Sequence, residues 1–131
     1  MRGLQTTITE TDYNLLAHFL ETAELTEFNR NRLMSELENA RIVREEYMPL
    51  NIVSYDTKVV VWNMDKNQTF TVHLVLPHES NGKEKISIYD PIALALIGYP
   101  SGAVTQWEMP DGIHTFKIVS VNQVDTGRIY A

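Results

Sequence analysis

The chain has 131 residues, of which 44% are hydrophobic, and a formal net charge of −6. This size and hydrophobic content suit one globular domain, or a small domain with a helical appendage, and they exclude a disordered chain. The acidic balance argues against a free-standing nucleic-acid-binding protein, and a sequence without cysteine has no disulfide, thiolate nucleophile or cysteine-ligated metal. The chain has neither a bilayer-spanning apolar run nor the apolar core of a signal peptide, so we expect a cytoplasmic protein without a membrane partner.

The first third of the chain is predicted to form a helical hairpin. Residues 1–9 are expected to be a short tail that ends in a capping-box spacing at Thr9. Apolar residues then recur three and four positions apart, which predicts one helix from about Glu10 to Glu24 and a second from about Asn29 to Glu46. Two amphipathic helices with a short connection pack as an antiparallel pair, so residues 1–46 should form a short helical arm.

This arm is strongly acidic. Residues 10–46 hold nine acids and four bases, and the first helix with its loop has no base at all. Three of the acids gather towards the expected tip: Glu21, Glu24 and Glu27. They form either a solvated helix face or an acidic tip directed at a metal ion or a basic channel, because carboxylates suit the oxygen preference of Mg²⁺.

The remainder, residues 47–131, is predicted to be an α+β domain. A proline ends helical character at the start of this part, and runs rich in β-branched and aromatic residues follow. One short apolar run between the third and fourth strands has proline at its start and glycine after its end, which predicts a two-turn buried helix at Pro91–Ile97. Five strands, mostly antiparallel, are predicted: Val53–Met64, Thr69–Leu76, Ile86–Ile88, Val104–Met109 and His114–Val124.

The sequence offers little that suggests catalysis. His73 and His78 lie on a strand and in a loop, so we interpret them as structural or solvated residues rather than metal ligands. His18 and His114 are expected at the surface. No nucleophile motif or phosphate-binding loop is present, so we expect no enzymatic activity, no cofactor and no metal site.

Four segments carry a family resemblance. The run ISIYDPIALALIG at Ile86–Gly98 resembles the C-terminal domain of the bacterial Gre transcription factors, whose pattern is Ile-Ser, Pro, a small residue and Ala-Leu-Leu/Ile-Gly. Trp107–Gly112 is similar to the family's next strand and its Pro and Gly turn, Leu74–Pro77 to its second strand, and Leu37–Val43 to the end of its arm. The segments occur in the family's order.

The resemblance implies a fold and a partner. The fold is an FKBP-like α+β domain, an antiparallel sheet wrapped on one short helix and preceded by a short antiparallel helical hairpin. The short arm is most similar to the Rnk type, described as regulators of nucleoside diphosphate kinase. The implied partner is RNA polymerase, bound at the rim of its secondary channel, with nucleic acid contacted at most through the polymerase. Tyr89, Asp90, Pro91 and Ile92 match the segment with which the family contacts polymerase.

Three functions follow from these observations. The first is a polymerase-binding regulator of transcription without catalysis of its own. The second is a transcript cleavage cofactor of the Gre type, in which Glu24 and Glu27 present carboxylates to the polymerase Mg²⁺. The arm is shorter than that of a long-arm Gre factor, and the sequence has Gly102-Ala103 where the family often has Gly-Asp. The third is an interaction module unrelated to transcription that shares the fold.

Overall fold

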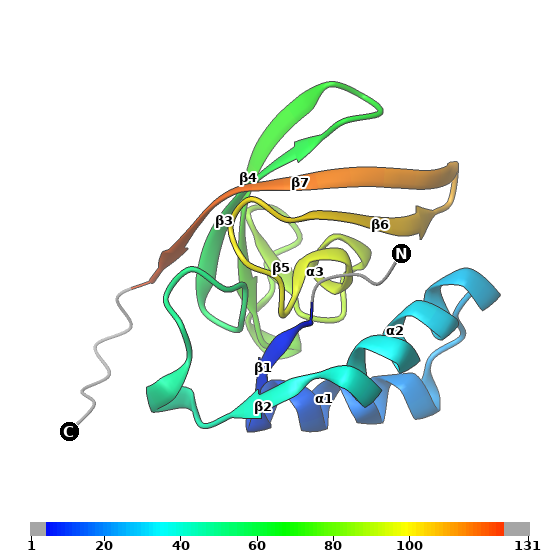
Figure 1. Ribbon diagram of the computed structural model, residues 1–131. Helices are drawn as coiled ribbons and strands as arrows, with labels where there is room; N and C mark the ends of the chain where they lie inside the picture. Colours follow the sequence, from blue (N-terminus) through cyan, green and yellow to red (C-terminus); the bar gives the residue numbers. More distant parts are fainter. Residues whose placement is uncertain (1–4, 125–131) are drawn as a thin grey trace.

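A computed structural model describes residues 5–124 and has the α+β fold expected from the sequence (Figure 1). A curled five-stranded sheet surrounds one short helix, and a two-helix hairpin lies against the same body. None of the helices in residues 5–124 is both long and apolar enough to cross a bilayer. In chain order the elements are β1 (Thr7–Thr9), α1 (Glu10–Thr22), α2 (Glu27–Asn39), β2 (Arg41–Val43), η1 (Glu45–Tyr47), β3 (Thr57–Asn63), β4 (Gln68–Val75), η2 (Pro77–Glu79), β5 (Lys85–Ser87), α3 (Pro91–Leu96), β6 (Val104–Met109) and β7 (Gly112–Gln123).

The main sheet has the strand order β5-β4-β3-β7-β6. The β3–β4, β3–β7 and β6–β7 pairs are antiparallel, and only β4–β5 is parallel. A register shift on β3 between Val60 and Val61 interrupts the β3–β7 ladder. Irregularities of this kind bend a strand and increase its twist, which helps the sheet to curl around α3.

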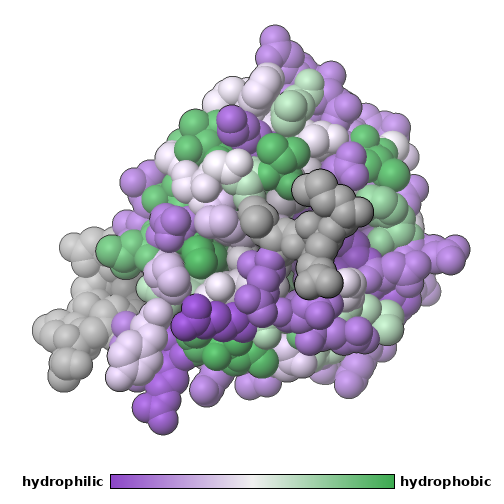
Figure 2. All heavy atoms as spheres, viewed as in Figure 1, coloured by the Kyte–Doolittle hydropathy of each residue, from purple (hydrophilic) through white to green (hydrophobic). Residues whose placement is uncertain are grey.

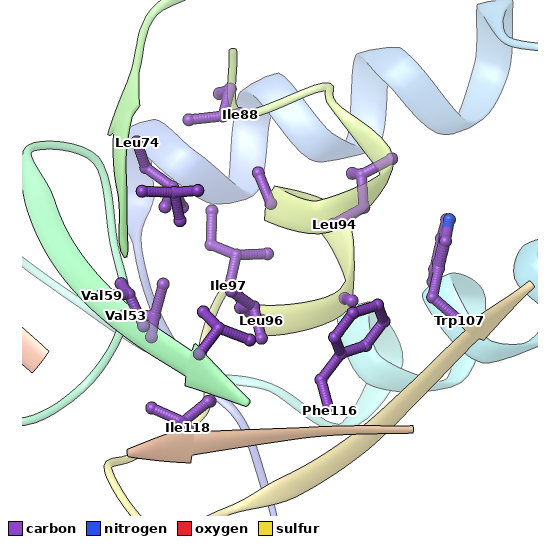
Figure 3. Close-up of a cluster of buried hydrophobic side chains, with 14 of the residues drawn as sticks. Val53, Val59, Leu74, Ile88, Leu94, Leu96, Ile97, Trp107, Phe116 and Ile118 are labelled. Carbon is purple, nitrogen blue, oxygen red and sulfur yellow. The ribbon is translucent and has the colours of Figure 1, made fainter. Parts of the chain in front are cut away.

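The core lies between α3 and the concave face of the sheet (Figure 3). Four consecutive residues of α3, Ala93 to Leu96, are buried, so this helix has no solvent-facing stripe over that length. The sheet contributes large buried side chains such as Trp107, Phe116 and Ile118. A helix that is apolar all round is stable only inside a core, which explains why the sequence shows a continuous run here rather than a periodic one.

Gly98 fixes the exit from α3. Its backbone has φ +87, and a Cβ added there would lie 2.9 Å from the Cβ of Thr6. Its carbonyl also accepts a hydrogen bond from the N–H of Thr7 at 3.0 Å. Glycine is therefore required both by conformation and by the close approach of β1.

The start of the chain corrects one prediction. Residues 7–9 are not part of a tail but form β1, which pairs in parallel with β2. The second helix accordingly ends at Asn39, seven residues before the predicted end, because residues 41–43 are extended in this ladder. Each strand has three residues, and the partners are 34 positions apart, so neither leaves a periodic signal in the sequence. Residues 1–4 lie outside the described part of the chain.

His114 is a second correction, because it is buried rather than at the surface. Its Nδ1 lies 3.1 Å from Asn63 Nδ2, and its Nε2 lies 2.7 Å from Asp111 Oδ1. β7 begins at Gly112, two residues before the predicted start, and His114 shares the inward face with Phe116 and Ile118. The imidazole can be buried here because each of its two ring nitrogens has a polar partner. His18 is exposed as expected.

The hairpin shares the core of the sheet. Leu16 of α1 and Leu33 and Leu37 of α2 belong to the same buried cluster as α3. The division of the chain near residue 46 remains a prediction from sequence periodicity, and residues 125–131 of the second predicted unit lie outside the described range. Burial of these leucines holds both helices against the rest of the molecule.

Candidate partner-binding surface

The segment Tyr89–Ile92 is a rigid turn at the start of α3. Asp90 caps the helix, since its Oδ1 accepts a hydrogen bond from the N–H of Ile92 at 2.9 Å. The N–H of Asp90 in turn donates to the carbonyl of Ser87 at 2.8 Å. Pro91 occupies the first helical position with an exposed side chain, and Ile92 is half-buried. The turn thus presents an exposed proline on a backbone fixed by hydrogen bonds and by the proline ring.

Tyr89 joins this turn to the hairpin. Its ring stacks on that of Phe19 in α1, with ring centroids 4.7 Å apart and planes at 24°. Its hydroxyl donates to the carbonyl of Leu15 at 3.0 Å, and burial raises the pKa of the phenol. The sequence indicated Tyr89 but gave no sign of its partners. The turn and the first helix therefore form one continuous surface, which we call the Tyr89 face.

The three tip acids are exposed, which suits both a solvated helix face and an acidic tip directed at a metal ion or a basic channel. Glu21 lies in the last turn of α1, Glu24 in the connection, and Glu27 at the first position of α2. The side chain of Thr26 caps α2, and a carboxylate at Glu27 suits a helix N-terminus. Across residues 5–124 no three histidine, aspartate or glutamate side chains are grouped so that they could hold a metal ion.

The side chain of Arg30, a basic residue of α2, reaches this tip. Arg30 donates from Nη1 to the carbonyl of Leu20 at 3.0 Å and from Nη2 to that of Ala23 at 2.9 Å. These are carbonyls at the C-terminal end of α1, where a cation is favourable. The loop between the helices is therefore tied to α2, and the acidic tip has one cation beside it.

Near the tip the hairpin is bound to β6 and α3. The Asn29 side chain makes two hydrogen bonds with the backbone of Glu108, donating to its carbonyl at 2.9 Å and accepting from its N–H at 2.8 Å. One turn further on, Arg32 Nη2 donates to the carbonyl of Ala95 at 3.0 Å. Two side chains within the first half of α2 thus hold it to the sheet domain.

Arg32 is also the centre of a buried cluster, which we call the Arg32 cluster. Its Nε lies 2.5 Å from Glu36 Oε1, and its guanidinium carbon lies 5.5 Å from the ring centroid of Trp107 and 5.6 Å from that of Tyr99. The Tyr99 hydroxyl donates to Glu36 Oε1 at 2.9 Å. Burial raises the pKa of Glu36 while Arg32 opposes the rise, and burial with the nearby Glu36 raises the pKa of Tyr99 to about 12.

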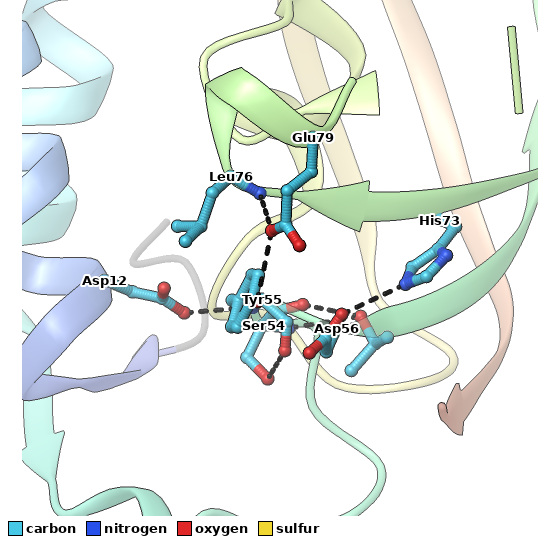
Figure 4. Close-up of polar contacts among 8 residues, drawn as sticks. Asp12, Ser54, Tyr55, Asp56, His73, Leu76 and Glu79 are labelled. Atoms are coloured by element: carbon cyan, nitrogen blue, oxygen red, sulfur yellow. Dashed lines mark hydrogen bonds and ion pairs between the residues drawn. The ribbon is translucent and has the colours of Figure 1, made fainter. Parts of the chain in front are cut away.

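A second polar group lies at the other end of the hairpin, around the segment 52–56 (Figure 4). Asp12 Oδ2 accepts from the N–H of Tyr55 at 3.2 Å, and the Tyr55 hydroxyl donates to Glu79 Oε1 at 3.1 Å. His73 Nε2 lies 3.2 Å from Asp56 Oδ1, and both side chains are buried. Asp56 has φ 63 at this tight corner, and β3 begins after it rather than at Val53. The buried ion-pairing position supports the structural interpretation of His73.

The surface itself shows no large apolar patch on the face drawn in Figure 2, where hydrophobic residues occur in separate small groups among hydrophilic ones. Exposed large hydrophobic side chains include Tyr47 and Leu50, at 72% and 73% exposure, which lie three positions apart in the sequence after β2.

Comparison with known proteins gives matches to one family. The family model described as "Transcription elongation factor, GreA/GreB, C-term" matches residues 48–123. Transcription elongation factor GreA of Helicobacter hepaticus is 36% identical over 92 residues, which are 70% of this chain and 56% of that protein. The corresponding factor of Acetivibrio thermocellus is 31% identical over 93 residues, 70% of this chain and 58% of that protein.

A solved structure of the family can also be compared with this chain over almost the whole length of both. It is described as "Prokaryotic transcription elongation factor GreA/GreB from Nitrosomonas europaea", with 30% identity, a TM-score of 0.67, and coverage of 91% of this chain and 98% of that chain. Coverage of 91% is more than residues 47–131 could supply, so the similarity includes the hairpin. By contrast, the alignments span less than three fifths of the length of the curated relatives.

Proposed function

Because the chain belongs to the GreA/GreB transcription elongation factor family, we propose that it regulates transcription by binding RNA polymerase at the rim of the secondary channel. Tyr89, Asp90, Pro91 and Ile92 dock on the polymerase, and the hairpin lies at the channel mouth. The chain acts without catalysis or a cofactor of its own, in the cytoplasm with the polymerase, and contacts nucleic acid only through it. The short hairpin fits the Rnk type of the family.

The position of the hairpin supports the proposal that the chain acts without catalysis. Its helices have 13 residues each, which corresponds to a length of about 20 Å. Asn29 and Arg32, both close to the tip, are hydrogen-bonded to β6 and α3. A hairpin held to its own domain almost to the tip cannot project far into a channel. It would instead occupy the channel mouth and exclude other factors that bind there.

Charge supports the same placement. Glu21, Glu24 and Glu27 are exposed at the end of the hairpin. An acidic tip would be steered towards a positively lined channel, an effect that raises the association rate and weakens as salt screens it. Binding to polymerase should therefore be stronger at low ionic strength.

The exposure of the same carboxylates favours a second candidate, the transcript cleavage cofactor. In that role Glu24 and Glu27 would hold the polymerase Mg²⁺ and help to activate water. A stalled, backtracked elongation complex separates the two candidates. Rapid RNA cleavage on addition of the protein, lost in Glu24→Ala/Glu27→Ala, would favour the cofactor. Absence of cleavage together with competition against a long-arm Gre factor would favour the regulator.

The docking turn is tested by a pull-down of polymerase core enzyme at low salt. Pro91→Glu places charge and bulk at an exposed position where a helix N-terminus accepts a carboxylate, so the fold should persist while binding falls at least tenfold. Pro110→Glu is the matched control, because it makes the same change at another exposed proline, in the β6–β7 turn. Equal binding by both variants would refute docking through the turn, and no binding by the unmodified chain would favour the unrelated interaction module.

A further inference from the structure

A pocket lies at the base of the hairpin. Its volume is about 150 Å³, and it lies where the start of α1, η1 and the segment 52–56 meet. A cavity of that order admits a benzene-sized molecule, so this one has room for several heavy atoms. Its lining includes Asp12, Glu45, Glu46, Met48, Leu50 and Tyr55.

Asp12 is the unusual member of this lining. Its residue is only 1% exposed, and its Oδ2 accepts the hydrogen bond from Tyr55 N–H. Its other carboxylate oxygen, Oδ1, is buried without a hydrogen-bond partner in the described part of the chain. A buried, unpartnered carboxylate oxygen is costly, and such atoms call for a partner that the isolated chain does not supply.

The surroundings of Asp12 are negative. Among the described residues, the lining includes the three carboxylates of Asp12, Glu45 and Glu46 and no base. Burial, with a smaller contribution from Glu45, raises the pKa of Asp12 to about 6, while Tyr55 N–H and the Thr9 hydroxyl act in the opposite direction. Asp12 is therefore still largely ionised at neutral pH. Among the described residues, the charged groups of the neighbouring elements that share this lining with Asp12 are Glu45 and Glu46, and the exposed Arg44 lies 4.0 Å from Glu46.

We propose that this pocket binds a primary alkylammonium group, with its charge beside the Asp12 carboxylate and the alkyl chain along Met48 and Leu50. A compact ammonium is favoured over a guanidinium because Tyr55 N–H already lies on one of the two oxygens that a bidentate fork would share, and only the other oxygen lacks a partner. A lysine side chain and a free diamine share this chemistry, and both have a stem that matches the apolar side of the lining. Leu50, 73% exposed, marks the open edge through which such a chain would enter.

The site is tested by NMR titration of the ¹³C,¹⁵N-labelled full chain in phosphate buffer. The probes are n-butylammonium chloride, n-butanol as the uncharged control, and n-butylguanidinium as the alternative cation. Saturable shifts at the Asp12 carboxyl carbon are expected with n-butylammonium alone, with a dissociation constant on the order of 1 mM. Comparable shifts with n-butanol, or tighter binding of the guanidinium, would overturn the proposal, as would displacement of the amine by Mg²⁺.

Two variants and a pH series sharpen the test. Asp12→Asn keeps an acceptor for Tyr55 N–H but removes the charge, so binding should be lost, whereas Glu38→Gln, an exposed acid on α2, should leave it unchanged. Glu45→Gln should weaken binding several-fold, which keeps the proposal testable should the first variant not fold. Affinity should fall about tenfold between pH 7.5 and pH 5 as Asp12 becomes protonated. Binding that Asp12→Asn leaves intact would refute the site.

The source of the amine is distinguished by two further ligands. One is 1,5-diaminopentane, and the other is lysine blocked at its amino and carboxyl ends. Tighter binding of the diamine would assign the pocket to a free polyamine-like molecule. Equal or tighter binding of the blocked lysine would assign it to a lysine of a protein partner. Both outcomes support the ammonium site, and neither depends on polymerase binding.

Discussion

The hairpin is joined to the sheet domain by two polar contacts of opposite character. Near the tip, the Arg32 cluster pairs a buried cation with Glu36, a backbone carbonyl and two aromatic rings. At the base, Asp12 is a buried anion that accepts a hydrogen bond from Tyr55 N–H, and no base is present among the described residues that line its pocket. The first contact brings two opposite charges together, although Arg32 Nη1 is buried without a hydrogen-bond partner in residues 5–124, whereas the second leaves Asp12 Oδ1 without a partner among those residues. A single interface can thus carry both its anchor and its binding site.

The largest loss of stability is expected when the ion pair between Arg32 and Glu36 is removed. Arg32→Ala would leave Glu36, whose side chain is 10% exposed, without its cation, and would remove the hydrogen bond to Ala95. Loss of one partner of a buried ion pair costs about 3–5 kcal/mol, so the free energy of unfolding measured in urea should fall by that amount. Arg41→Ala, at an exposed position of β2, is the control and should cost less than about 0.5 kcal/mol.

A double variant decides whether charge is the cause. In Arg32→Ala/Glu36→Gln the stranded carboxylate is gone, so part of the lost stability should return. If the double variant were as unstable as the sum of both single variants, packing of Arg32 on Tyr99 and Trp107 would account for the loss instead.

Removal of the Asp12 charge at the base of the hairpin should raise the free energy of unfolding rather than lower it. The pKa of Asp12 is raised from 3.8 to about 6 in the folded state, so the fold binds this proton more tightly than the unfolded chain. The group therefore destabilises the fold above pH 6, and that penalty is relieved as the pH falls through 6 towards 4. Asp12→Asn should raise the free energy of unfolding at pH 7.5 by up to about 3 kcal/mol.

The measurement is urea unfolding of both proteins from pH 4 to pH 7.5 in amine-free buffer. The difference between Asp12→Asn and the unmodified chain should be near zero at pH 4 and should grow through pH 6. Glu38→Gln should show no such growth. A difference that does not vary with pH would mean that the Asp12 side chain matters through its hydrogen bond with Tyr55 N–H rather than as a buried charge.

Local signals predicted the sheet domain well but said little about what the hairpin touches. Pro91 and Gly98 lie at the two ends of one short helix, so its position could be read from adjacent residues. The pairing of Ile8 with Ile42 could not, because each strand has three residues and the partner is distant in sequence. A charged residue in an amphipathic helix suggests a solvated face, which is why neither sequence periodicity nor composition indicated the burial of Arg32 or Asp12.

Contacts between distant segments were also missing from the sequence-based prediction of the candidate surface. The resemblance to Gre factors indicated Tyr89 to Ile92, and the structure shows the turn that these residues form. It could not indicate that Phe19 stacks on Tyr89, because that contact joins two segments 70 residues apart. The acids at the tip were visible in the sequence, but the ties from Arg30 to the end of α1 were not, since they depend on how closely the two helices pack.

The smallest expected effect concerns the neutral contact between the hairpin and the docking turn. Tyr89→Phe removes the hydrogen bond to the Leu15 carbonyl but keeps the stack on Phe19, so the free energy of unfolding should fall by about 1 kcal/mol. Tyr99→Phe is the matched variant in the Arg32 cluster. Its hydroxyl donates to a buried carboxylate, so that loss should be larger, about 2 kcal/mol. Equal losses would mean that the charge on Glu36 adds nothing to this hydrogen bond.

Polymerase pull-down gives the second readout, because Tyr89→Phe retains the ring and should bind as the unmodified chain does. Weaker binding despite an intact fold would show that the Tyr89 hydroxyl, by fixing the turn to α1, sets the geometry with which the chain docks.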